Sequence, residues 1–220
     1  MCALIRVTPL EIDDRLNDFG IVRDQLIAIV HAMVAAKAEC TDNDPPSAPG
    51  WSSWRHGTRR AREIFRSKGW LKDDAGLSTI VNHSLGMRIA VANTDDATGI
   101  ASDEVNPQNV SRKGAATDRA VDGNQKSLFR DLPPDEKIIP FVPRERHTSA
   151  YATYYVCVFG EGVEVRAEFS CPIKVVDGFF VGFSERIILV KPGEWPPAPM
   201  DKREEPDSDV TEFDIPVRRK

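Results

Sequence analysis

The sequence predicts an α+β fold in which N-terminal helices pack on a C-terminal antiparallel β-meander. Three observations indicate it: apolar residues recur at helical spacing before residue 72, alternation of apolar and polar residues begins near residue 77, and aromatic and β-branched residues dominate after residue 148. With 220 residues, of which 41% are hydrophobic, the chain is long enough to bury a sizeable core. The composition excludes wholesale disorder, collagen and a coiled-coil rod.

Four segments follow one another along the chain, and we expect them to form one domain and a tail. They are a helical part (1–72), a strand hairpin with a long polar segment (73–127), the β-meander (128–190) and a proline-rich charged tail (191–220).

The first helix is predicted to begin at Thr8-Pro9-Leu10-Glu11, which has an N-cap threonine, a proline at the first helical position and a glutamate at the third. The apolar stripe that follows keeps its phase through Gly20, so we expect one long helix to about Lys37 with a kink at that glycine.

A second helix carries four arginines on one face. The loop expected before it covers Thr41 to Gly50 and holds three prolines, and Gly69 is a plausible stop at its end. The arginines are spaced 4, 3 and 4 residues apart, which places them in one stripe. They are Arg55, Arg59, Arg62 and Arg66.

Residues 87–92 alternate as a strand, with 77–82 as a partner. The stretch from residue 93 to 127 is polar and too long for an ordinary loop, so it is either functional or flexible.

The β-meander should contain four or five antiparallel strands whose apolar face the helices cover. Its first hairpin is expected to turn at Gly160-Glu161-Gly162, and Asp177-Gly178 is a strong signal for a second hairpin. Glu164, Arg166 and Glu168 share one strand face, where alternating charge is typical of a solvent-exposed surface.

The arginine stripe predicts a nucleic-acid interface, because guanidinium groups at helical spacing can contact successive phosphates. Segment 51–72 carries seven basic and one acidic residue, whereas the whole chain has a net charge of −5. Trp51, Trp54 and Trp70 could add stacking. The open alternatives are another anionic partner, or pairing of the arginines with the acidic first helix or with residues 93–104. The predicted binding residues are Arg55, Arg59, Arg62, Arg66, Lys68 and Trp54.

A weaker candidate is a divalent metal site. Asp95 and Asp96 directly follow a strand, and His83 on the preceding connection is a possible ligand or base. The same residue types also make an ordinary turn. No nucleophile motif or phosphate-binding loop occurs, so we assign no catalytic residue and, apart from this metal, no cofactor.

Location and partners follow from absences. The four cysteines lack zinc-site spacing, the N-terminus does not resemble a secretion signal, and the longest uncharged apolar stretch (25–36) falls short of the roughly 20 residues of a bilayer span. We therefore expect a cytoplasmic protein without membrane contact. The leading hypothesis is a non-enzymatic nucleic-acid-binding protein. The alternatives are a protein-interaction or assembly subunit that uses tail 191–220 to bind a protein partner or form a homo-oligomer, and a metal-dependent hydrolase or nuclease.

Overall fold

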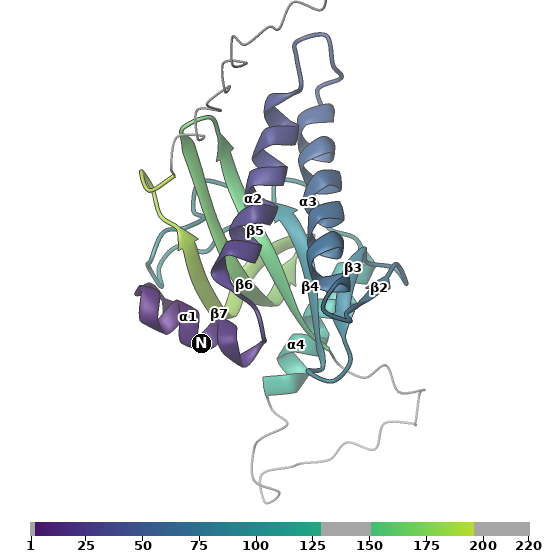
Figure 1. Ribbon diagram of the computed structural model, residues 1–220, viewed down its shortest axis with the longest axis vertical. Helices are drawn as coiled ribbons and strands as arrows, with labels where there is room; N and C mark the ends of the chain where they lie inside the picture. Colours follow the sequence, from purple (N-terminus) through teal and green to yellow (C-terminus); the bar gives the residue numbers. More distant parts are fainter. Residues whose placement is uncertain (1–2, 129–150, 196–220) are drawn as a thin grey trace, which may run out of the picture.

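A computed structural model describes residues 3–128 and 151–195 and has the expected α+β fold (Figure 1). Within these residues, seven strands form one sheet in the order β1-β7-β6-β5-β4-β3-β2. The strands are β1 (Leu4–Arg6), β2 (Leu71–Asp73), β3 (Thr79–Asn82), β4 (Met87–Asn93), β5 (Ala152–Glu161), β6 (Glu164–Val176) and β7 (Phe179–Val190). The helices are α1 (Pro9–Asp18), α2 (Arg23–Ala38), α3 (Ala48–Arg66) and α4 (Ala115–Leu128).

The expected long first helix is two helices, so that prediction was wrong. The capping box of Thr8 and Glu11 is present and begins α1 as predicted. The chain then turns at Gly20, whose φ of 64° is left-handed, and the Gly20 and Ile21 amides donate to carbonyls in the last turn of α1. This glycine-terminated helix end stops α1 rather than kinking it. The axes of α1 and α2 differ by 97°.

Helix α3 lies beside α2 on the same face of the sheet (Figure 1). It begins at Ala48, inside the expected loop, because Pro49 fits the first helical turn, where its missing amide hydrogen is not needed. The predicted stop at Gly69 is confirmed by its φ of 83°. The short strand β2 follows at once and was not predicted.

The predicted antiparallel meander is confirmed for the described C-terminal strands, and it forms part of a larger mixed sheet. Strands β5, β6 and β7 are antiparallel, and β3 pairs with β4 as predicted. However, β4 runs parallel to β5 and β1 runs parallel to β7. Parallel neighbours need a crossover, and α4, which was not predicted, lies in the connection between β4 and β5.

Two details of the meander also differ. The first hairpin turns at Gly162-Val163, because Glu161 pairs with Glu164, while the Asp177-Gly178 turn is confirmed by positive φ at both residues. The described part of the meander has three strands instead of the expected four or five, because β6 and β7 are each one long strand. Register shifts, not turns, interrupt their pairing.

The core has two layers, one on each face of the sheet. The larger cluster joins α1, α2 and α3 to one face, and the smaller joins Val121 of α4 to Tyr155, Phe180 and Phe183 on the other.

In the described part of the chain, no single helix is long and apolar enough to cross a membrane. Helices α1 and α2 reach the required length and apolar composition only when they are taken together, and they are bent relative to each other. Most of the predicted tail (191–220) lies beyond Trp195 and therefore outside the described residues.

Candidate nucleic-acid interface

A groove runs between α3 and the segment that contains β2. Its volume is about 390 Å³. All four arginines of the stripe line it together with Lys72 of β2, and Glu63 is the carboxylate among its lining residues. The predicted stripe therefore forms one wall of a single surface feature.

The residue pattern of α3 explains this placement. The helix buries Gly57, Ala61 and Phe65 against its neighbours. Because a helix repeats every 3.6 residues, the arginines fall on the adjoining face and lie at the edge of the buried stripe. At Gly57 the backbone of α3 packs tightly against α2, because a Cβ at this position would lie 2.7 Å from Met33 Sδ.

Two of the groove's cations are neutralised within the fold. Arg62 forms an ion pair with Asp74 and also donates to the Asp73 carbonyl at 3.4 Å. Lys72 Nζ lies 2.7 Å from the same Asp74 carboxylate. Hydrogen bonds from Lys72 and Arg62 lower the pKa of Asp74 to about 2, so this carboxylate is ionised at neutral pH.

The other three arginines of the stripe are exposed and form no ion pair with a carboxylate in the described residues. Arg55 places its guanidinium 5.1 Å from the centre of the Trp51 ring and 2.8 Å from His56 Nε2. Glu63 pairs instead with Arg60, at 3.5 Å. Among the described residues, internal pairing therefore occurs at Arg62 but not at Arg55, Arg59 or Arg66, and its partner is Asp74 rather than the first helix or residues 93–104.

The remaining predicted residues separate into two groups. Trp54 is half-buried and lines the groove. Lys68 is not among the lining residues, because its Nζ donates to the Gly20 carbonyl at 2.9 Å and to Gln25 Oε1 at 3.0 Å. Trp70, which we considered for stacking, is only 5% exposed and packs on Phe65 with ring centres 4.9 Å apart.

The proposed metal ligands are not brought together. His83 lies before β4 and Asp95 after it, so the seven-residue strand separates them by roughly 20 Å. Nδ1 of His83 is 2.5 Å from the Tyr151 hydroxyl oxygen. One oxygen of Asp95 accepts hydrogen bonds from the amides of Ala97 and Gln108, as in an ordinary turn. Across residues 3–128 and 151–195, no three His, Cys, Asp or Glu side chains form a group that could hold a metal.

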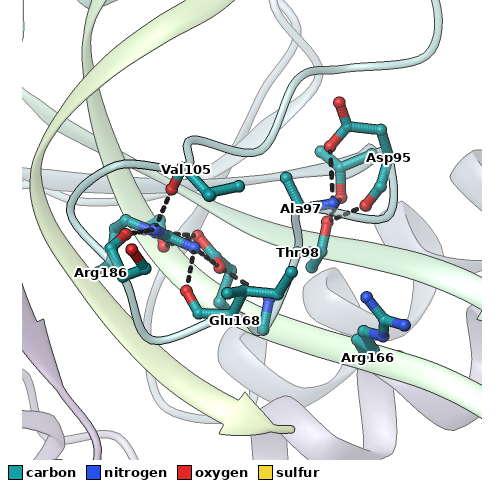
Figure 2. Close-up of polar contacts among 12 residues, drawn as sticks. Asp95, Ala97, Thr98, Val105, Arg166, Glu168 and Arg186 are labelled. Atoms are coloured by element: carbon teal, nitrogen blue, oxygen red, sulfur yellow. Dashed lines mark hydrogen bonds and ion pairs between the residues drawn. The ribbon is translucent and has the colours of Figure 1, made fainter. Parts of the chain in front are cut away.

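Figure 2 shows what lies beside this turn. Glu168 and Arg186 are both fully buried, and Arg186 Nη2 lies 2.7 Å from the Glu168 carboxylate. Arg186 also donates to the carbonyls of Ile100, Ser102 and Val105. The expected solvent exposure of Glu168 was wrong, because part of the polar segment 93–127 folds over this strand face and supplies its polar partners.

No known protein family matches this chain, and no characterised protein or solved structure shows significant similarity to it. The geometry and charge of the groove are therefore the features from which we infer a function.

Proposed function

We propose that the protein binds nucleic acid through the groove beside α3. One observation carries this proposal. Arg55, Arg59 and Arg66 are exposed along a single groove and have no carboxylate partner among the described residues. Phosphate groups are suitable acceptors for them, because the guanidinium donors match phosphate oxygens in geometry and charge.

The length of the stripe favours a polymer over a single phosphate. Arg55 and Arg66 are eleven residues apart in one helix, which corresponds to roughly 16 Å at a rise of about 1.5 Å per residue. Duplex DNA has a phosphate about every 3.4 Å of axis on each strand, so several phosphates span this distance. A small anion would contact only one end of the stripe.

Three phosphate contacts give a modest, measurable salt dependence. For three contacts, raising salt from about 50 to about 200 mM should weaken binding roughly twentyfold for a single strand and roughly fortyfold for a duplex. Lys72 should add little to this dependence, because Asp74 already neutralises part of its charge.

The test compares two neighbouring charge reversals by fluorescence anisotropy with labelled DNA and RNA. Arg59→Glu changes a groove residue, and Arg60→Glu makes the same charge change on an exposed side chain outside the groove lining. We expect Arg59→Glu to weaken binding about tenfold or more and to reduce the salt slope, whereas Arg60→Glu changes the affinity less than threefold.

Adding Arg66→Glu to Arg59→Glu should abolish measurable binding while the circular dichroism spectrum and thermal midpoint stay near those of the wild type. Equal effects of Arg59→Glu and Arg60→Glu would contradict the proposal, since long-range charge alone would then account for the binding. Failure of the wild-type protein to bind any of the probes at low salt would also contradict it.

A further inference from the structure

We infer that the ligand of this groove is a single strand, with a base stacked against the exposed Trp51–Arg55 pair at the start of α3. This inference depends on the proposed function and specifies which nucleic acid the groove accepts. It follows from the shape of the groove and from the position of the aromatic side chains.

The arginines lie in a concavity, which does not suit duplex recognition by an inserted helix. A helix that reads duplex DNA must protrude far enough to enter a major groove about 12 Å wide and about 8.5 Å deep. Here α3 packs against α2 and the sheet, and Lys72 and Ser78 form the facing wall of the groove. A volume of about 390 Å³ is near the small end of the range for ligand pockets, so it suits individual nucleotides of an open strand.

Aromatic side chains lie next to the arginines, as in many sites for single strands. Trp54 lines the groove, and Trp51 is 56% exposed one helical turn before Arg55. The Arg55 guanidinium lines the groove and lies over the Trp51 ring, so that a planar cation and an exposed indole are in contact at this position. Single-stranded bases stack on such groups, whereas the bases of an intact duplex are stacked on one another and are not available.

Stacking groups thus lie at the start of α3, and the charged groups follow along the same helix. A strand that contacts Arg59 and Arg66 through its phosphates can place a base on the Trp51–Arg55 pair without leaving the helix. In this arrangement the arginines supply sequence-independent affinity, and Trp51 distinguishes an open strand from a duplex.

The experiment measures anisotropy at about 50 mM salt with three probes of one sequence: a single strand, its duplex, and a single strand in which every base is replaced by an abasic site. We expect the single strand to bind at least tenfold more tightly than the duplex. Trp51→Ala should weaken binding of the single strand about tenfold, whereas Trp51→Phe should retain most of the affinity. Because Trp51 is exposed, both variants should keep the wild-type thermal midpoint.

The abasic strand separates stacking from an indirect effect on Arg55. If Trp51 stacks on a base, Trp51→Ala should leave the weaker binding of the abasic strand unchanged. Equal loss on both strands would overturn the inference, because it would show that Trp51 only positions the Arg55 charge. Duplex binding as tight as that of the single strand would also overturn the inference. In that case the proposed function would still hold if Arg59→Glu weakened binding and Arg60→Glu did not. If no probe binds, both proposals fail.

Discussion

Replacing Glu168 with glutamine should be among the most destabilising single changes to the described residues. The Glu168 carboxylate accepts hydrogen bonds from Arg186 Nε at 3.0 Å, Arg186 Nη2 at 2.7 Å, Ser170 Oγ at 2.7 Å and the Gly99 amide at 3.0 Å. Glutamine keeps the size of the side chain but removes its charge and turns one acceptor oxygen into a donor group. The guanidinium of Arg186 would then stay fully buried without its counter-charge.

The size of the effect follows from these contacts. Removing one partner of a buried ion pair costs about 3 to 5 kcal/mol. Each Glu168 oxygen accepts from Arg186 and from a second donor, so the new amide group faces one guanidinium donor in either orientation. The lower end applies if the amide group takes the position of the oxygen shared with Ser170, because that hydroxyl can rotate and accept instead. We therefore expect Glu168→Gln to lower the free energy of unfolding by about 3 kcal/mol or more, a large part of the roughly 5 to 15 kcal/mol of a typical domain.

Urea unfolding followed by circular dichroism measures this loss, and Glu164→Gln provides the matched control. Glu164 lies on the same strand and also pairs with an arginine, Arg166, but its side chain is 52% exposed. The same chemical change there should cost at most about 1 kcal/mol, because solvent screens exposed pairs. If Glu168→Gln costs no more than Glu164→Gln, the buried pair does not carry the stability that we assign to it.

Two further predictions concern α3 and the groove. Gly57→Ala should lower the free energy of unfolding in urea by about 1 to 3 kcal/mol, because the added methyl group overlaps the fully buried Met33 side chain. An unchanged midpoint would contradict this prediction, because it would show that the Met33 side chain can move aside at little cost. For Asp74, NMR titration should give a pKa of about 2, because Lys72 and Arg62 bind its ionised form. The contribution of Asp74 to stability is therefore complete above the unfolded pKa near 4 and is lost as pH falls through about 2. Asp74→Asn should remove this part of the pH dependence of stability. The same change should strengthen nucleic-acid binding, because it removes the carboxylate that pairs with Arg62 and Lys72.

The parts of the fold that could be predicted are those with strong local signals. The capping box at Thr8, the turn at Asp177-Gly178 and the stop at Gly69 each depend on residues close together in sequence, and the structure confirms all three. The break at Gly20 was missed because the apolar stripe continues in phase across it, so periodicity alone cannot distinguish one helix from two. The break could have been predicted only by recognising that Gly20 can adopt the left-handed conformation that ends a helix.

Other elements depend on contacts between distant residues. Helix α4 buries mainly small or polar side chains, such as Ala120, Val121 and Asn124, so its apolar signal is weak. Asn124 is buried because its side chain bonds the backbone of Thr153 and Pro172, which lie on two strands more than 25 residues away. No local pattern in the sequence reports such contacts.

The polar composition of the segment from residue 93 to 127, which left function and flexibility as open alternatives, has a structural explanation. The buried face formed by Glu168, Ser170 and Arg186 is polar, so an apolar cover would leave its donors unpaired at a cost of about 1 to 3 kcal/mol each. Residues 99–105 instead supply one amide and three carbonyls to this face. A polar segment is therefore what this face of the sheet requires.

The same distinction between local pattern and distant contact applies to the candidate site. The spacing of the arginines places them on one face of α3, but it cannot show which of them are already paired. That depends on the turn after β2, which brings Asp74 to Arg62 and leaves Arg59 and Arg66 without such a partner in the described residues. A charge reversal at Arg62 would therefore place a carboxylate next to Asp74 and disturb the groove wall. Reduced nucleic-acid binding by such a variant would not distinguish a lost ligand contact from local damage. Arg59 and Arg66 are the positions at which reduced binding would report on the ligand.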